Sequence, residues 1–101
     1  MIAYISGPMT GLPGQNYAAF EAAADRLRAQ GVQVISPHEI TPPGAGPWSW
    51  AQHMRVDLAA LLTADVIVLL PGWETSRGAQ LEKTVADALG LVVDYRLTET
   101  S

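Results

Sequence analysis

Glu82 is the residue whose type and position point most directly to chemistry. The run from about Arg77 to Leu89 has helical periodicity, and its polar residues face water. Its buried stripe consists of Leu81, Val85, Ala88 and Leu89. On the helical wheel Glu82 lies beside this stripe rather than on the polar face, and we expect it to point toward the ends of the strands. The alternative is a boundary glutamate that reaches solvent or pairs with an arginine, because glutamate is seldom fully buried.

Asp57 is the candidate for a second carboxylate beside Glu82. It lies at the edge of the apolar stripe of the preceding predicted helix, and both helices flank the same strand. Two carboxyl groups in different surroundings can act as nucleophile and acid. The alternative is an exposed aspartate paired with Arg55 or His53. Tyr4, in the first predicted strand, can reach the same edge, or it is a core tyrosine whose hydroxyl meets one partner.

The loop from Gly72 to Ala79 ends at a predicted helix start, where free amides and the helix dipole attract anions. Ser76 can cap this helix, and that structural role alone is an alternative explanation for it. Gly78 allows a ligand to approach the backbone closely. The first loop, from Gly7 to Gly11, has neither the dinucleotide-binding fingerprint nor the spacing of a triphosphate-binding loop, which weakens a redox or kinase interpretation.

The two histidines do not predict a metal centre. His38 and His53 are distant in sequence and poorly accompanied by other ligands. His38 follows the second predicted strand and is a candidate ligand contact, whereas the alternative for both is an ordinary hydrogen-bonding or surface role. The sequence contains no cysteine, which excludes thiolate sites and thiol nucleophiles, and it lacks the Gly-x-Ser-x-Gly pattern. We expect neither a metal nor a cofactor.

The elements that must position these residues alternate along the chain. Strands are predicted at residues 2–6, 32–36, 66–70 and 91–95, and helices begin near Asn16, Ser49 and Arg77. The proline-rich stretch from Pro37 to Pro47 is expected to be a loop without regular structure. Such alternation predicts right-handed crossovers and a parallel sheet with helices on both faces. Ligands then bind at the carboxyl ends of the strands.

Composition and charge limit the remaining possibilities. The 101 residues are enough for one domain, and such a small domain encloses a deep pocket with difficulty, so we expect a homodimer or higher homo-oligomer. Six basic and ten acidic residues give a net charge of −4 with no basic run, which argues against polymeric nucleic acid. The longest apolar run, Val66 to Leu70, is too short for a bilayer, and no secretion signal is evident. We expect a cytoplasmic protein and no membrane partner.

Several short motifs occur in a recognisable order. They are Tyr4-Ile5-Ser6-Gly7-Pro8-Met9, Leu27-Arg28-x-x-Gly31, Asp57 ahead of Ala64-Asp65, and Ser76-x-Gly78-Ala79-x-x-Glu82. In these motifs the chain resembles the nucleoside 2-deoxyribosyltransferase superfamily, which includes the deoxynucleoside 5'-monophosphate N-glycosidases. The run Leu70-Pro71-Gly72-Trp73-Glu74 makes it similar to a short bacterial and phage branch. The resemblance implies one domain over residues 1–101 with a flavodoxin-like or Rossmann-like three-layer sandwich, whose parallel sheet has four to five strands and helices on both faces.

The resemblance also implies roles for the candidate residues. Glu82 corresponds to the nucleophile, Asp57 to the acid that protonates the leaving base, and Tyr4 to the residue that orients the nucleophile. Attack on the anomeric carbon gives a covalent glycosyl intermediate, which water resolves in a hydrolase and a second base resolves in a transferase. The implied substrate-binding residues are Gly7, Pro8, Met9, His38, Ser76 and Gly78. The substrate class is a nucleoside or nucleoside 5'-monophosphate, and no cofactor is implied.

Two departures from the family pattern leave the phosphorylation state open. Ser76 stands where the transferases carry an aspartate, whereas the monophosphate hydrolases carry a serine that helps to hold phosphate. The hydrolases also have an arginine in the first loop, where this chain has Met9 and Thr10, and Arg77 is a candidate to compensate.

Two other classes of function compete with an enzyme. The first is a non-catalytic module that binds or senses a nucleotide. The second is a structural partner domain in which Trp48, Trp50 and Trp73 form a protein interface rather than a wall for base stacking.

Overall fold

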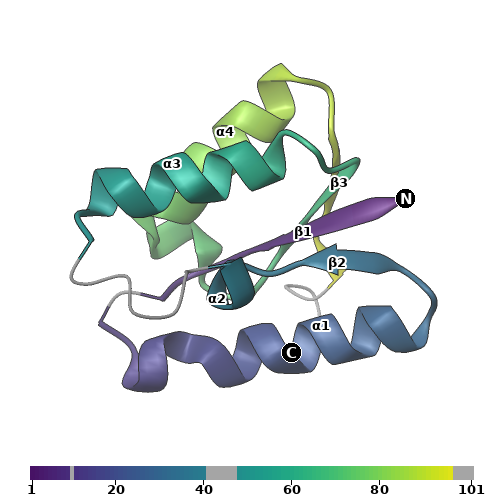
Figure 1. Cartoon of the computed structure of the whole chain (residues 1–101), viewed down its shortest axis with the longest axis horizontal. Helices are drawn as coiled ribbons and strands as arrows, with labels where there is room; N and C mark the ends of the chain where they lie inside the picture. Colours follow the sequence, from purple (N-terminus) through teal and green to yellow (C-terminus); the bar gives the residue numbers. More distant parts are fainter. Residues whose placement is uncertain (10, 41–47, 97–101) are drawn as a thin grey trace.

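The sheet has four parallel strands in the order β2-β1-β3-β4 (Figure 1). The computed structural model describes residues 1–9, 11–40 and 48–96. The strands are β1 (Ile2–Ser6), β2 (Gln33–Ile35), β3 (Val66–Leu69) and β4 (Val92–Asp94). Tyr4 at the centre of β1 is paired with Ile35 on one side and Ile67 on the other. The strand order reverses between β1 and β3, which makes their carboxyl ends the switch point where ligands bind in such sheets.

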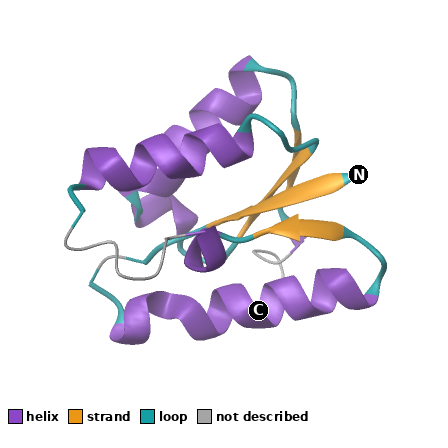
Figure 2. Cartoon of the chain, viewed as in Figure 1, coloured by secondary structure: helices purple, strands orange, loops and turns teal. Residues whose placement is uncertain are grey.

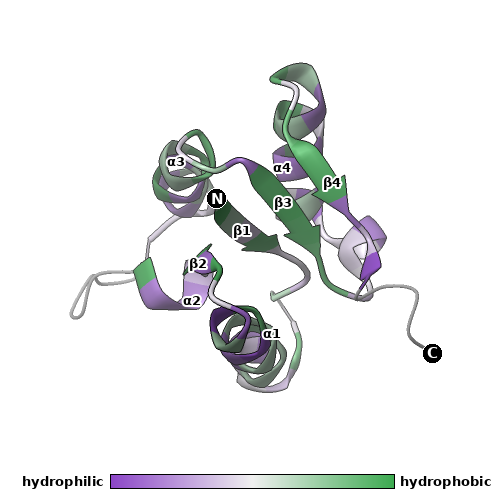
Figure 3. Ribbon diagram, turned by 90° about the vertical axis from the view of Figure 1, so that its right-hand side faces the viewer, coloured by the Kyte–Doolittle hydropathy of each residue, from purple (hydrophilic) through white to green (hydrophobic). Residues whose placement is uncertain are grey.

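Helices cover both faces of the sheet (Figure 2). Helix α1 (Tyr17–Ala29) lies on one face, and α3 (Trp50–Leu61) and α4 (Arg77–Ala88) lie on the other (Figure 3). The shorter elements are η1 (Pro13–Asn16), α2 (Pro37–Ile40) and η2 (Trp73–Thr75). The predicted α/β three-layer sandwich with a parallel sheet is therefore confirmed, with four strands in the sheet. In the part of the chain that is described, no helix is long and apolar enough to cross a membrane.

The alternation of side chains along β1 separates two apolar clusters. Ala3 and Ile5 face α1, where they pack with Phe20 and Leu27. Tyr4 faces the opposite way and packs among residues of α3, β3 and α4. Burying each large apolar side chain contributes about 1.5–3 kcal/mol, so both faces of β1 stabilise the fold. The strands at the centre of the sheet are accordingly the most hydrophobic part of the ribbon in Figure 3.

The two helices on the second face begin at serines, as predicted. The Ser49 hydroxyl accepts a hydrogen bond from the Gln52 amide, and the Gln52 side chain accepts one from the Ser49 amide in return. Ser76 Oγ accepts a hydrogen bond from the Ala79 amide at the start of α4. Such caps satisfy amides that the helix itself leaves unpaired.

Two local predictions are corrected. Asn16 precedes α1 but does not cap it, since its side-chain amide donates to the carbonyl oxygen of Pro8 at 2.9 Å. The stretch from Pro37 to Pro47 was expected to lack regular structure, yet Pro37–Ile40 forms the one-turn helix α2. Proline is tolerated at the first helical position because that amide has no intrahelical partner. Residues 41–47 of the predicted loop lie outside the described residues.

Candidate active site

Glu82 is a buried carboxylate held by two hydroxyl groups of β1. It projects from α4 and is only 4% exposed. Ser6 Oγ donates a hydrogen bond to Oε1 at 2.8 Å, and the Tyr4 hydroxyl donates one to Oε2. Tyr4 and Ser6 are two residues apart on the strand, so both side chains leave the same face of the sheet. Both oxygens of the carboxylate are thereby fixed in position.

The surroundings of Glu82 raise its pKa toward neutral pH. Burial raises the pKa of Glu82 to about 7, and the hydrogen bonds from Tyr4 and Ser6 act in the opposite direction. The charge of Asp57 raises the pKa of Glu82 further. Burial, with additional effects from Glu82 and Asp57, also raises the pKa of Tyr4, so its hydroxyl stays protonated and remains a donor.

Asp57 occupies different surroundings on the neighbouring helix. Its side chain is half-buried on α3, and burial raises the pKa of this carboxyl to about 6. Among the described residues, none donates a hydrogen bond to it. Asp57 and Glu82 line the same cavity. The stripe predicted for α4 is corrected, because Ala88 and Leu89 are exposed and Glu82 shares the buried face with Ala79 and Ala86. The cavity therefore presents two carboxyl groups that titrate near neutral pH.

The cavity lies at the carboxyl ends of the strands and has a volume of about 490 Å³, enough for a small molecule. Its lining includes Gly7, Met9, Ser76 and Gly78, four of the six residues expected to bind substrate. Pro8 does not line it, although its carbonyl oxygen accepts the hydrogen bond from Asn16. Tyr4 lies behind the wall, where it is fully buried and contacts Glu82.

Aromatic side chains form much of the remaining wall. They are Tyr17, Phe20, Trp48 and Trp50, and His53 and Met54 lie next to them. The guanidinium of Arg77 stacks over the Trp50 ring at 3.7 Å from its centroid, and Trp48 lies 5.1 Å from His53 between ring centroids. Trp50 thus has a cation–π contact with Arg77, and Trp48 has a tilted ring contact with His53. The wall suits a flat, aromatic part of a ligand.

His38 lies outside the lining of the cavity. Its Nδ1 is 2.5 Å from Ser36 Oγ, and its ring lies 5.5 Å from the ring of Tyr17 between centroids. His38 thus contacts Tyr17, an aromatic residue of the wall, without lining the cavity itself. The expected substrate contact of His38 remains a prediction, because the geometry shows only this supporting position.

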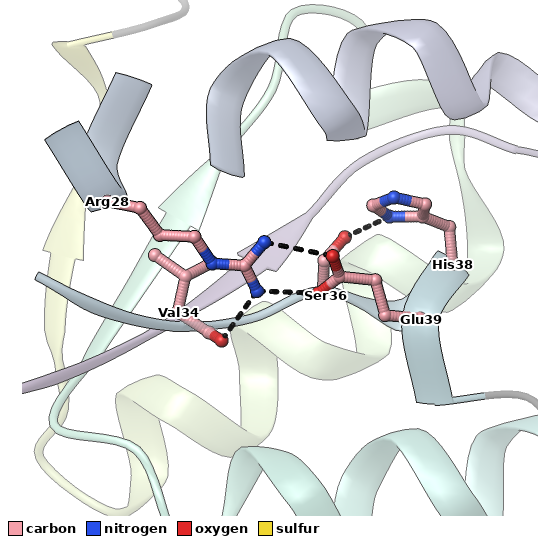
Figure 4. Close-up of polar contacts among 5 residues, drawn as sticks. All are labelled: Arg28, Val34, Ser36, His38 and Glu39. Atoms are coloured by element: carbon pink, nitrogen blue, oxygen red, sulfur yellow. Dashed lines mark hydrogen bonds and ion pairs between the residues drawn. The ribbon is translucent and has the colours of Figure 1, made fainter. Parts of the chain in front are cut away.

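An ion pair fastens α2 to α1 beside His38 (Figure 4). Arg28 donates to both carboxylate oxygens of Glu39 at 2.9 and 2.6 Å and to the carbonyl oxygen of Val34 at 3.2 Å. An exposed pair of this kind contributes only about 0–1 kcal/mol. Its structural effect is to hold the helix whose first residue, Pro37, lines the cavity.

Gly78 allows α4 to pack closely against α3. A Cβ atom at this position would lie 3.2 Å from Met54 Sδ, so a larger residue would press on the helix that carries Asp57. In the described residues no group of three or more His, Asp or Glu side chains is arranged to hold a metal ion. The groups that line the cavity include the two carboxyls, the His53 ring and the residues at the start of α4, whereas the two hydroxyls bound to Glu82 are buried behind its wall.

Ser6 and His53 are site residues that sequence reasoning did not single out. Ser6 appeared only as part of the first motif, yet a two-residue spacing from Tyr4 places it on the same face of β1. This two-residue spacing was the feature of the sequence that could have identified Ser6 as a site residue. His53 was considered only as a surface residue or as a partner of Asp57, and it lines the cavity beside Trp48.

The fold and the cavity define a class, the flavodoxin-like α/β proteins with a ligand-sized cavity at the switch point of the sheet. Within that class, the sequence model of the family described as "Domain of unknown function (DUF4406)" matches residues 1–95, and the chain belongs to this family. No curated protein matches the chain.

A solved structure with the same fold is the "2-desoxiribosyltransferase from Leishmania mexicana". It superposes with a TM-score of 0.68 and 21% sequence identity over 91% of this chain. The chain spans 61% of the length of that protein. At this identity the likeness establishes the fold, and the printed activity belongs to that protein.

Proposed function

We propose that the chain is an enzyme that cleaves or transfers the N-glycosidic bond of a nucleoside, a deoxynucleoside or a nucleoside 5'-monophosphate. The observation that carries this proposal is the Glu82 carboxylate, buried at the wall of a cavity that also presents Asp57. The aromatic wall suits a nucleobase, and the fold shared with a deoxyribosyltransferase supports the same reaction class.

In the first step, Glu82 and Asp57 act on opposite ends of one bond. A Glu82 oxygen forms a bond to the anomeric carbon, and the bond from that carbon to the base nitrogen breaks. The electron pair of the broken bond stays with the base, which takes a proton from the Asp57 carboxyl. The products of this step are a free base, a glycosyl ester of Glu82 and an ionised Asp57.

In the second step, the glycosyl ester is resolved. The Asp57 carboxylate accepts a proton from water, whose oxygen bonds to the anomeric carbon as the ester bond to Glu82 breaks. In the transferase reaction a second base takes the place of water, and Asp57 accepts the proton from the nitrogen of that base. Both outcomes return Glu82 to its ionised form and Asp57 to its protonated form.

The first step needs Glu82 ionised and Asp57 protonated, and a bound substrate favours this distribution. Asp57 is half-buried and has no hydrogen-bond donor in the described part of the chain, so filling the cavity removes water from it and favours its neutral form. Glu82 is already buried and keeps its two donors, so it loses little on binding.

The decisive experiment measures release of free base from a panel of nucleosides and nucleoside monophosphates by chromatography. We expect Glu82→Gln to lower turnover at least about 1,000-fold, because the amide is a poor nucleophile with no negative charge. Glu21→Gln, on the exposed side of α1, is the matched control and should keep full activity.

Mass spectrometry of the intact protein separates this proposal from the non-catalytic alternative. After an acid quench during turnover, we expect a protein carrying one additional sugar, attached to Glu82. A protein that binds members of the panel but releases no base and never acquires the sugar contradicts the proposed reaction and supports a binding or sensing module.

A further inference from the structure

Ser6 is a buried hydroxyl whose partner is the Glu82 carboxylate. It is the last residue of β1 and is fully buried, with its Oγ 2.8 Å from Glu82 Oε1. Neither the aromatic wall nor the apolar clusters require a hydroxyl at this position, because its neighbours across the sheet are hydrophobic. The interaction that accounts for a hydroxyl at this position is therefore its hydrogen bond to Glu82.

The two hydroxyl donors favour the ionised form of Glu82. Tyr4 and Ser6 each supply one hydroxyl hydrogen, and within the described residues Glu82 is the acceptor that both reach. A carboxylate accepts both hydrogen bonds more strongly than a neutral carboxyl does, so losing the charge would weaken both contacts. Ionised Glu82 satisfies both donors at once.

We propose that Ser6 is a positioning residue that, together with Tyr4, favours the ionised form of Glu82 against the effect of burial and fixes the direction of its carboxylate. The groups that face Glu82 are Tyr4 and Ser6 from β1 and Asp57 from α3. Burial and Asp57 favour the neutral form of Glu82, and the two hydroxyls oppose them. Among residues 1–9, 11–40 and 48–96 no such donor reaches Asp57, so Ser6 helps to distinguish the nucleophile from the acid.

A direct titration of the Glu82 carboxyl tests the inference without any substrate. Glutamate labelled with carbon-13 at the side-chain carboxyl reports each midpoint by NMR, and Glu82→Gln identifies the signal. We expect Ser6→Ala to raise the midpoint of Glu82 by about one pH unit, because a lost hydrogen bond to a charged group disfavours the charged form. Ser6→Cys keeps a similar volume with a weaker donor and should shift the midpoint in the same direction by less.

Ser36→Ala is the matched control. Ser36 is equally buried in the segment that follows the adjacent strand β2, but its hydroxyl meets His38 instead of Glu82. We expect this variant to leave the Glu82 midpoint unchanged. An unchanged midpoint in both Ser6→Ala and Ser6→Cys overturns the inference, as does an equal shift in Ser36→Ala. If Ser6→Ala does not fold, Ser6→Cys alone decides the direction.

The consequence for catalysis rests on the proposed function, and the two are separable. In an active protein, the acidic limb of the pH profile of kcat, which reports the complex with substrate, should move to higher pH in Ser6→Ala. A wild-type protein without base release contradicts the proposed function while the titration still decides the role of Ser6. A shifted midpoint with an unmoved acidic limb would show that the limb belongs to another group.

Discussion

At the residue scale, Glu82 and Asp57 show how surroundings give one type of side chain two roles. Both are carboxyls on one cavity, yet Glu82 accepts two hydrogen bonds and is buried, whereas Asp57 is half-buried and accepts none in the part of the chain that the structure describes. Donors favour a carboxylate, and loss of water without donors favours a carboxylic acid. In the free protein the pKa of Glu82, about 7, lies above that of Asp57, about 6, so the proposed role of Asp57 as proton donor requires a bound substrate to remove water from Asp57 and reverse this order.

We therefore expect Asp57→Asn to lower kcat/KM about 100- to 10,000-fold on substrates whose base must be protonated to leave. A nucleoside whose base already carries a positive charge, such as a 7-methylpurine nucleoside, needs no acid and should lose far less. The basic limb of the pH profile should also disappear. The measurement is base release, with Asp25→Asn on the exposed side of α1 as control. Equal losses on both kinds of substrate would contradict the assignment of Asp57 as acid.

At the element scale, periodicity explains which site residues were predictable. The strand position of Tyr4 follows from a local pattern, and its hydroxyl contacts Glu82. The wheel placed Glu82 beside an apolar stripe that includes Ala88 and Leu89, but both are exposed and Glu82 itself lies on the buried face. The position of His38 does not follow from such patterns, because it depends on α2, a one-turn helix within a proline-rich stretch. Ser6 lies two residues after Tyr4 and therefore on the same face of β1. Its contact with Glu82 could be expected only once the contact between Tyr4 and Glu82 was known.

Gly7 shows how closely the ends of β1 and β3 approach beneath the cavity. A Cβ atom at Gly7 would lie 2.7 Å from Leu70 Cβ, an atom that cannot move without the backbone. We expect Gly7→Ala to lower the free energy of unfolding by about 1–3 kcal/mol, as overpacking does. Urea denaturation provides the measurement.

Gly78→Ala is the contrasting variant for Gly7→Ala. The atom it would meet is the sulfur of the flexible Met54 side chain, and alanine forms helices better than glycine by about 1 kcal/mol. We expect it to cost less stability than Gly7→Ala. A Gly7→Ala protein as stable as the wild type would mean that β1 and β3 are less tightly packed at this end than the structure indicates.

At the scale of the whole molecule, a small domain keeps its reactive groups at one edge of an apolar sheet. The order β2-β1-β3-β4 brings the ends of β1 and β3 together, and α3 and α4 each add one carboxyl there. The alternation of elements predicted this arrangement, whereas the size and aromatic lining of the cavity depend on side chains distant in sequence. Burying two carboxyls has a cost in stability that the surrounding core must offset.

The cost should appear as a pH dependence of stability. Folding raises the pKa of Glu82 from 4.5 to about 7 and that of Asp57 from 3.8 to about 6. At a pH between the unfolded and folded pKa values of a carboxyl, the folded protein binds more protons than the unfolded chain does. The free energy of unfolding should therefore fall as pH rises from about 5 to about 7. We expect a loss on the order of 2 kcal/mol, measured by urea denaturation at both pH values. The paired carboxylates Glu39 and Asp94 have lowered pKa values and act only at more acidic pH.

Glu82→Gln removes the group with the larger of the two pKa shifts, and its amide does not titrate. The free energy of unfolding of this variant should therefore change less with pH than that of the wild type. The double variant with Asp57→Asn should abolish it between pH 5 and pH 7, while Glu21→Gln should behave as the wild type. If wild type and Glu82→Gln lose the same stability over this interval, Glu82 is not the buried titrating group. The hydrogen bonds from Tyr4 and Ser6 would then offset the effect of burial on the pKa of Glu82, and the pH dependence would belong to another group.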